Sequence, residues 1–400
     1  METSKPWSIS ATLRGFYDDN YAAVHKNIND DVDSLGFEIR PAAQLNFLPT
    51  EQTFIGVGYI YSMKYYADRD ENTADHTHEV TLKADHRFSE RYKIEFDDSF
   101  VYAQEPTLIE EGAVGAPDRT DSDAFRNRAA LNFTADITEL LGVGLGYQNL
   151  WYDYDQDGDF SRSALLDRLE HLFRIDGRWR VRESTVALLG YQYGVFSYTG
   201  DEIINDPDFP AGSVTNNDGD EGVSEDRDST SHYFYIGAEQ ALTTQFSASA
   251  RVGAQFTDYD NLDQDHTSPY ADIHGTYTYL PGSYLQFGFR HTLNATDLAG
   301  GTGNDITTDQ ETSALFASIN HRITPRTTGS LVGQYQRSSF NNGLYDGEVD
   351  NFLLLGLNFE YRFNPNWAAE LGYNYDRLDS DIVLRSYTRN RVYAGVRATY

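Results

Sequence analysis

The last ten residues of the chain alternate strictly between two kinds of side chain. Val392, Val396 and Tyr400 lie on one apolar row, and Arg391 and Arg397 lie on the opposite, polar row. Successive side chains of a β-strand point to opposite faces, so this segment is predicted to be a strand with one apolar and one charged face. If many such segments occur in one chain, only a few β-sheet folds can accommodate them.

The period of two recurs in about eighteen segments of about 10–15 residues each. In most of them the apolar row is unambiguous, whereas in 312–322 and 327–338 the pattern does not say which face is apolar. The clearest rows are Trp7-Ile9-Ala11-Leu13, Ile55-Val57-Tyr59-Tyr61, Phe246-Ala248-Ala250-Val252-Ala254-Phe256, Leu353-Leu355-Leu357-Phe359-Tyr361-Phe363 and Trp367-Ala369-Leu371-Tyr373-Tyr375.

The connections between these segments alternate in length. Eight short turns, such as 182–184 and 364–366, separate nine long polar stretches, such as 104–124 and 200–230. This segregation is typical of a membrane barrel with tight periplasmic turns and long outer loops. Tyrosines at the strand ends, followed by acidic residues, are expected to form the interfacial girdle of such a barrel.

Composition excludes the main alternatives. With 23% charged residues, no stretch has the roughly 18 consecutive apolar residues that a membrane helix needs. The net charge of −31 disfavours nucleic acid or an anionic membrane surface as partner. The chain has no cysteine, and its start lacks the apolar core of a signal peptide. The protein is therefore expected to be either cytosolic or the mature form of an exported protein with an added Met1, and a membrane barrel requires the second.

The sequence thus predicts an all-β fold: residues 1–400 form a single transmembrane antiparallel β-barrel in the bacterial outer membrane. About eighteen strands are expected, with sixteen as the alternative, and the long acidic loops are expected to be extracellular. A soluble propeller is the competing fold, but it requires a blade signature every roughly 40–50 residues, and none is present.

The two faces of the strands have opposite character. Outward rows carry almost no charge at mid-strand, so that Leu355→Arg should impair insertion whereas Leu354→Arg, on the inward row, should be tolerated. Inward rows are rich in charge and are expected to line the pore. The candidate pore-lining residues are Arg14, Arg40, Arg126, Arg128, Arg168, Arg174, Arg251, Arg290, Arg389, Arg391, Arg397, Glu38, Glu95, Glu360 and Glu370.

Two consequences of these charges remain open. The arginines of the closing strand, together with Arg126 and Arg128, could give the pore a positive inner wall beneath an acidic rim, which favours anions. Alternatively, each arginine pairs with Glu38, Glu360 or Glu370 and stiffens the wall.

The outer loops contain candidate calcium ligands. Asp153, Asp155, Asp157 and Asp159 alternate as in the first half of a calcium-binding loop, but Ala164 stands where the closing glutamate belongs. Residues 201–228 hold ten acidic residues and one basic residue, Arg227. That loop is expected to constrict the mouth, bind divalent cations or repel polyanions, or else to be a solvated surface loop. No cofactor other than this calcium is expected.

The run Ser386-Tyr387-Thr388-Arg389-Asn390-Arg391-Val392, followed by Gly395 and the terminal aromatic residue, resembles the β-barrel porin 2 family. The matched motif covers the last fifteen residues, and some members of the family accompany exopolysaccharide synthesis and export. The resemblance implies an outer-membrane barrel associated with polysaccharide. It also implies a shared role for Tyr387, Arg389, Asn390 and Arg391 on the final strand.

The predicted function is a porin-like channel for hydrophilic solutes, with a conduit for exported exopolysaccharide as its more specific form. The alternatives are a structural or adhesive surface barrel with a plugged lumen, and an outer-membrane hydrolase. No nucleophile elbow supports the hydrolase, so the chain is not expected to be an enzyme. The expected partners are outer-membrane lipid and lipopolysaccharide, the solute or polysaccharide, and the assembly machinery that reads the terminal Tyr400.

Overall fold

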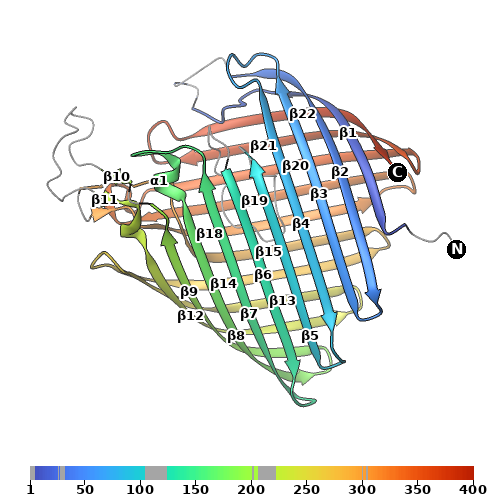
Figure 1. The fold of residues 1–400 in the computed structure, drawn as a ribbon, viewed down its shortest axis with the longest axis horizontal. Helices are drawn as coiled ribbons and strands as arrows, with labels where there is room; N and C mark the ends of the chain where they lie inside the picture. Colours follow the sequence, from blue (N-terminus) through green and yellow to red (C-terminus); the bar gives the residue numbers. More distant parts are fainter. Residues whose placement is uncertain are drawn as a thin grey trace.

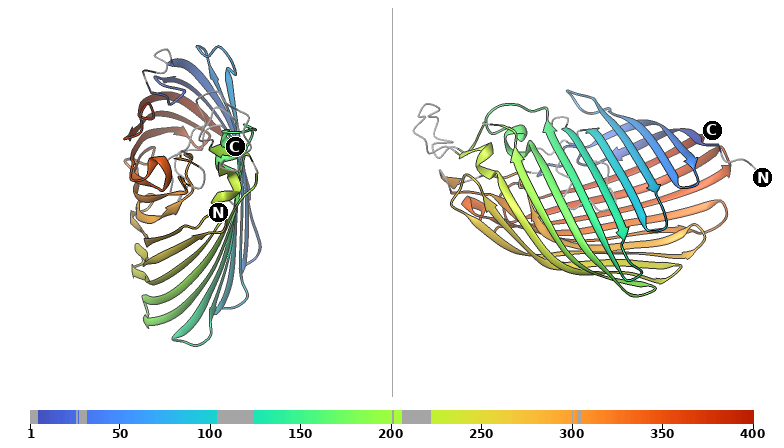
Figure 2. Two further views of the ribbon diagram at one scale, coloured as in Figure 1. Left: turned by 90° about the vertical axis from the view of Figure 1, so that its left-hand side faces the viewer. Right: turned by 60° about the horizontal axis from the view of Figure 1, so that its bottom comes forward.

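The computed structural model describes residues 5–25, 27, 32–103, 124–200, 202–205, 222–299, 301–302 and 305–400. Eighteen strands form one antiparallel sheet, in which each strand pairs with its neighbours along the chain and β22 returns to pair with β1. The barrel is therefore closed, and the predicted all-β fold and strand number are confirmed. Figures 1 and 2 show the earlier strands crossing one wall and the later strands crossing the opposite wall.

The strands of the barrel are long, and the remaining elements are short pieces within the connections. The barrel strands are β1 (Trp7–Asp18), β2 (Ser34–Thr50), β3 (Thr53–Tyr66), β4 (Ala74–Arg87), β5 (Tyr92–Ala103), β6 (Ala124–Asp136), β7 (Leu141–Tyr154), β8 (Arg168–Arg182), β9 (Thr185–Tyr198), β12 (Ser229–Thr243), β13 (Phe246–Tyr259), β14 (Asp265–Leu280), β15 (Ser283–Asn294), β18 (Asp309–Arg322), β19 (Thr327–Asn341), β20 (Val349–Asn364), β21 (Trp367–Ser380) and β22 (Tyr387–Thr399). The connections contain α1 (Arg162–Leu166), β10 (Ile203–Asn205), β11 (Gly222–Val223), η1 (Ser224–Arg227), β16 (Gly301–Thr302), β17 (Asp305–Ile306) and η2 (Gly343–Tyr345).

Short turns and long connections lie at opposite ends of the barrel. All eight short turns fall where the sequence predicts them, and both chain ends lie at the short-turn end (Figure 1). There the Tyr400 ring lies 5.7 Å from the Trp7 ring, and the backbones of Tyr400 and Ile9 exchange two hydrogen bonds. In the part of the chain that the structure describes, no helix has the length and apolar character needed to cross a membrane.

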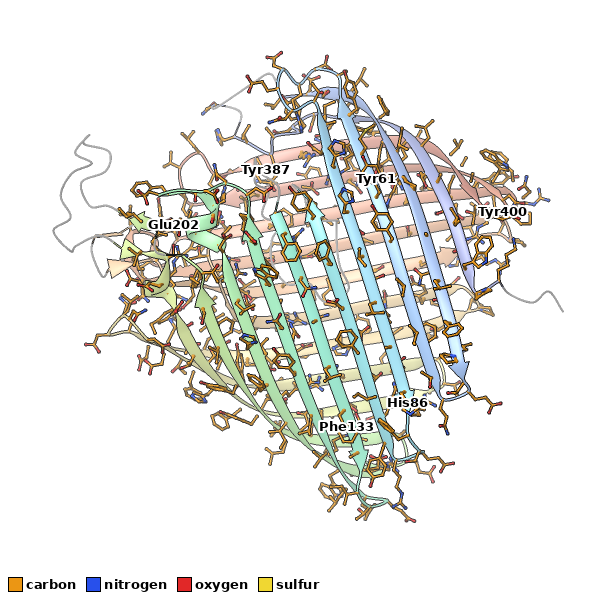
Figure 3. All side chains as sticks on the ribbon, in the orientation of Figure 1. Tyr61, His86, Phe133, Glu202, Tyr387 and Tyr400 are labelled. Carbon is orange, nitrogen blue, oxygen red and sulfur yellow. The ribbon has the colours of Figure 1, made fainter. Side chains whose placement is uncertain are left out.

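The outer surface carries the apolar rows and two aromatic belts. In the belt nearer the loops, tyrosines pair with polar rings or amides of the adjacent strand: Tyr59 Oη lies 3.0 Å from His78 Nδ1, and Tyr147 Oη lies 2.9 Å from His171 Nδ1. Tyrosines and similar amphipathic groups concentrate at the membrane–water interface, so we expect this belt to mark the outer boundary of the bilayer. Figure 3 labels Tyr61 of this belt, and Phe133 near the short-turn end of the same wall. The other pairs of this kind are Tyr61–His76, Tyr191–His232, Tyr335–Asn351 and Tyr373–Asn390.

The structure assigns the faces of the two ambiguous strands. In β18, Leu315 and Ile319 are exposed on the outside, and in β19 Leu331 and Tyr335 are exposed there. Gln334 lies on the opposite, inward row and is buried. The sequence pattern is weak here because the inward rows contain apolar as well as polar residues.

One inward cluster shows that the lumen is not polar throughout. Phe352, Leu354 and Leu378 are buried against one another inside the barrel, with Tyr387 packed beside them. Leu354 is on the inward row, as predicted, but it is only 2% exposed. An arginine at this position would have to displace close packing, so Leu354→Arg is no longer expected to be tolerated.

The wall has one irregularity near the loop end. Pairing between β14 and β15 stops at Ala271 and His291, although β14 continues beyond this point toward the loops. Pro269 lies in the part of β14 that does not pair with β15. Proline has no N–H to donate to a neighbouring strand, which explains why the ladder ends there.

A side chain closes the gap that the interrupted ladder leaves. The carboxamide Oε1 of Gln255, on β13, accepts hydrogen bonds from Thr292 Oγ1 at 3.0 Å and from the Leu293 backbone N–H at 3.1 Å. Gln255 is 1% exposed, so its amide substitutes for the missing backbone partners in a buried position.

Candidate pore and its mouth

All fifteen residues predicted to line the pore lie on rows that alternate with the exposed apolar rows and therefore face the barrel interior. Most of those near the closing strand are held in ion pairs. Five others border an internal cavity: Arg126, Arg128, Arg168, Arg174 and Arg290. Arg251 and Glu95 form ion pairs elsewhere on the wall.

Near the closing strand, Arg14 contacts two carboxylates at once. Its Nη1 lies 3.0 Å from Glu38 Oε2, and its Nε contacts Glu370. These residues come from β1, β2 and β21, so the network spans the seam at which the barrel closes. Arg40 lies on the same inward row of β2 as Glu38.

The arginines of β22 are also paired. Arg389 Nε lies 2.9 and 3.0 Å from the two carboxylate oxygens of Asp18, and both side chains are at most 2% exposed. Arg391 Nη2 lies 2.5 Å from Asp376 Oδ2, and Arg397 contacts Glu360. Arg14 and Arg397 thus contact the glutamates named in the second alternative, whereas Arg389 and Arg391 pair with Asp18 and Asp376, which were not predicted as partners from the sequence.

A further network lies on the opposite wall, on β8, β12 and β13. Asp176 accepts a hydrogen bond from Tyr235 Oη at 2.7 Å and lies 3.4 Å from Arg174. Glu239 is 2.8 Å from Arg178 and 3.6 Å from Arg251. The three arginines and two carboxylates of this network hold neighbouring strands in register and leave an excess of one positive charge. Near the periplasmic end Glu95 pairs with Lys93, and farther around the wall Arg290 lies 3.3 Å from Asp272.

The interior contains a cavity of about 1200 Å³ that is lined by residues of strands from β5 round to β22 and by several loops. Its lining has eight arginines and five acidic residues. The arginines are Arg126, Arg128, Arg162, Arg168, Arg174, Arg227, Arg290 and Arg385, and the acidic residues are Glu170, Asp272, Asp297, Asp309 and Asp350. The cavity is thus more positive than the chain as a whole.

Arg126 and Arg128 project from β6 into this cavity. Among the described residues no carboxylate lies within ion-pair distance of either one, and Arg128 has only a long contact of 3.5 Å with Gln148 Oε1. The charge of these two arginines is therefore left for a solute.

The mouth is crossed by an ionic cluster centred on Asp297, in the β15–β18 connection. Arg385 donates from both Nη atoms to the two oxygens of Asp297 at 2.7 Å each, and Arg162 Nη1 lies 3.2 Å from Oδ2. Arg385 also reaches Asp350 at 2.8 Å. The two guanidinium groups hold the pKa of Asp297 at about 2, below the ordinary carboxylate value.

This cluster bridges opposite sides of the barrel. Arg162 lies in the β7–β8 connection and Arg385 in the β21–β22 connection; eight barrel strands separate these hairpins on one side and six on the other. We call the group formed by Arg162, Asp297, Arg385 and Asp350 the mouth bar.

Several loops form a small apolar core beside the mouth bar. Buried Ala164, Ile204, Leu262 and Ile306 come from four different connections and pack together with the end of β13. The neighbouring Asp167 is largely shielded from water, and this burial raises its pKa to about 6. The loops therefore have a fixed arrangement of their own in the part of the chain that the structure describes.

The four calcium candidates are not gathered into a site. Asp155 accepts a hydrogen bond from Tyr102 Oη at 2.7 Å, and Asp159 accepts one from the Ile203 N–H at 3.1 Å. Within the described ranges no three acidic, His or Cys residues are placed to hold a metal ion, so calcium binding by Asp153–Asp159 stays a prediction. Most of the acidic loop 201–228 lies outside the described residues.

Sequence reasoning missed the mouth bar, because Asp297 and Arg385 lie in polar loops that carry no periodic signal. It also missed Asp98, an acidic residue on the outward row of β5 that accepts a hydrogen bond from Asn127 at 2.7 Å. The row Tyr92-Ile94-Phe96 continues into Asp98, so the alternating pattern itself contained this signal.

Residues 214–400 match the model of the family described as "Putative beta-barrel porin 2". The resemblance seen in the terminal motif is thereby confirmed over the C-terminal part of the chain. Together with the closed barrel, it places this protein among channel-like barrels of the bacterial outer membrane. No curated protein matches the sequence significantly.

Solved structures of outer-membrane proteins are similar at low identity. OccAB3 of Acinetobacter baumannii is 11% identical, with a TM-score of 0.44 over 98% of this chain and 99% of that one. The outer membrane protein opdK of Pseudomonas aeruginosa is 11% identical, with a TM-score of 0.42 over 98% and 99% of the two chains. The siderophore receptor PirA of the same organism is 9% identical, with a TM-score of 0.42 over 98% and 80%. Similarity this low carries nothing over to the present chain.

Proposed function

We propose that this protein is a passive outer-membrane channel for hydrophilic solutes and that it prefers anions. The observation that carries the proposal is the lining of the internal cavity, which contains eight arginines and five acidic residues. Of the residues that the structure describes, none places a carboxylate within ion-pair distance of Arg126 or Arg128. A field of one sign inside a low-dielectric wall concentrates counter-ions of the opposite sign. The acidic loops then act as an outer rim that an anion passes before it reaches the positive interior.

Reversal potentials in a salt gradient across a planar bilayer test the preference. The parent channel should favour chloride over potassium, and the double variant Arg126→Gln/Arg128→Gln should lose most of this preference. Arg362→Gln is the matched control: Arg362 is an inward arginine that does not line the cavity and is paired at 2.6 Å with Glu360. Cation preference in the parent would mean that the acidic loops set selectivity.

The second candidate is a conduit associated with exopolysaccharide export. It is supported by the tyrosines and amides of the cavity lining, because sugar rings stack on aromatic faces and hydrogen-bond to carboxamides. Tyr233 and Tyr270 pack edge to face at 5.3 Å, and Gln334 and Gln336 lie farther round the same cavity. A glycan chain would require the mouth bar to open.

Liposomes that contain the protein separate these candidates. A solute channel should admit monosaccharides and exclude long maltooligosaccharides. A glycan conduit should pass both once the mouth bar is removed. A barrel that conducts neither ions nor sugars, even without the mouth bar, would be the plugged structural or adhesive alternative. Binding of lipopolysaccharide and recognition of Tyr400 by the assembly machinery are proposals that follow from the location.

A further inference from the structure

Arg227 is a buried arginine that lines the cavity and has no acidic partner. It ends η1 just before β12, is 1% exposed, and lies 5.3 Å from the centre of the Tyr198 ring. Among the described residues no carboxylate lies within ion-pair distance of it, and its pKa is lowered, chiefly by burial. Buried charges are normally paired, so an isolated one requires an explanation.

The neighbouring acidic residues are committed elsewhere. Asp226 accepts a hydrogen bond from the Val223 backbone N–H at 2.8 Å, and Asp228 accepts one from the Tyr198 backbone N–H at 2.6 Å. Arg168, which pairs with Tyr198 in the sheet register, adds a like charge nearby and is itself occupied by Glu170 at 2.8 Å. The local fold thus leaves the charge of Arg227 uncompensated.

The guanidinium group of Arg227 has one hydrogen bond of regular geometry, and the Tyr198 hydroxyl lies close enough to interact with it as well. Nη1 donates to the Thr296 carbonyl oxygen at 2.9 Å, which fastens the β15–β18 connection. Nε and Nη2 are buried and have no hydrogen-bond partner. These two nitrogens lie on the same edge of the planar group, and their parallel N–H bonds match the two oxygens of a carboxylate.

We propose that Arg227 is a binding site for the carboxylate of a hydrophilic solute, such as an acidic sugar, within the cavity. The solute's two oxygens accept from Nε and Nη2, while Tyr198 and Tyr259, which line the same part of the cavity, contact the rest of the molecule. This proposal rests on the proposed channel function and specifies its substrate class. If Arg227 only fastened the β15–β18 connection, its Nη1 atom would be sufficient and the Nε and Nη2 donors would have no role.

The test uses the full-length barrel in planar bilayers, with sodium glucuronate, glucose and sodium phosphate as probes. Glucuronate should reduce chloride current in the parent, and the concentration for half-block should rise about tenfold or more in both Arg227→Gln and Arg227→Lys. Lysine retains the positive charge but cannot donate two parallel N–H hydrogen bonds to a carboxylate. Arg362→Gln removes an inward arginine that does not line the cavity and is paired with Glu360, so it should leave the half-blocking concentration within about threefold.

Several results would overturn the site. Equal block of the parent and Arg227→Lys by glucuronate would show that the paired Nε and Nη2 donors do not bind the solute. Equal block by glucose and glucuronate would show that the solute does not need a carboxylate. Phosphate that blocks at lower concentration than glucuronate would reassign the edge to another anion. If no current is observed, the channel function is contradicted, but the binding site can still be tested by calorimetry with glucuronate and the folded protein. The absence of a heat of binding in that measurement would contradict the site.

Discussion

Replacing Asp297 by asparagine should open the mouth of the barrel without unfolding its wall. The change removes the negative charge that Arg385 and Arg162 share, and it leaves two guanidinium groups close together in a nearly dry position, where the Asp297 side chain is 8% exposed. The lowering of its pKa from 3.8 to about 2 corresponds to roughly 2 kcal/mol. Removing one partner of a buried ion pair typically costs about 3–5 kcal/mol.

Taking the lower figure, the population of an open β15–β18 connection should rise about thirtyfold. Hydrogen exchange measures this directly, because the Thr307 N–H donates to the Ala299 carbonyl oxygen at 2.7 Å inside that connection. Single-channel conductance should increase in parallel, since the mouth bar no longer spans the opening. In the parent, the contribution of Asp297 is present above about pH 4 and is lost as the pH falls toward its folded-state pKa of about 2.

Asp379→Asn is the matched control. Asp379 pairs with Arg377 at 3.3 Å near the β21–β22 connection, which also contains Arg385. Both side chains are more than half exposed, so the pair should contribute little to stability. Unchanged exchange at Thr307 in Asp297→Asn, or the same increase in both variants, would refute the idea that the mouth bar holds the loops together.

Three further outcomes are expected. Leu355→Arg places a charge against lipid at mid-strand and should cost roughly 2–4 kcal/mol of folding free energy in vesicles, whereas Ser318→Arg, on an inward row, should not; equal folding of both would contradict the face assignment. Gln255→Ala leaves the Leu293 N–H unsatisfied and should destabilise the barrel by about 1–3 kcal/mol in urea titrations, with the exposed Gln52→Ala as control. Deleting Tyr400 should slow assembly in cells much more than refolding in detergent, because the loss of its Ile9 and Trp7 contacts affects only one end of a closed wall; equal effects in both would remove its special role in assembly.

The sequence by itself determined the barrel. A strand's side chains alternate whatever its surroundings, and an 18-stranded barrel in lipid requires one apolar row per strand, so the row from Leu353 to Phe363 could be assigned to the outside without a structure. Turn residues such as Asn364-Pro-Asn366 similarly mark the periplasmic ends locally. Where the inward row also contains apolar residues, as in β18 and β19, this information was missing.

The tertiary structure alone decided what the charges do. Sequence periodicity placed Arg389 and Arg126 on the same kind of inward row, yet Arg389 is neutralised by Asp18, 371 residues away in the chain, and Arg126 is not neutralised. The mouth bar likewise joins three connections that are distant in sequence, and Arg227 stands out only because the folded loops bury it without a counter-charge. Ion pairing depends on distances of a few ångströms between remote residues, and no local pattern contains those distances.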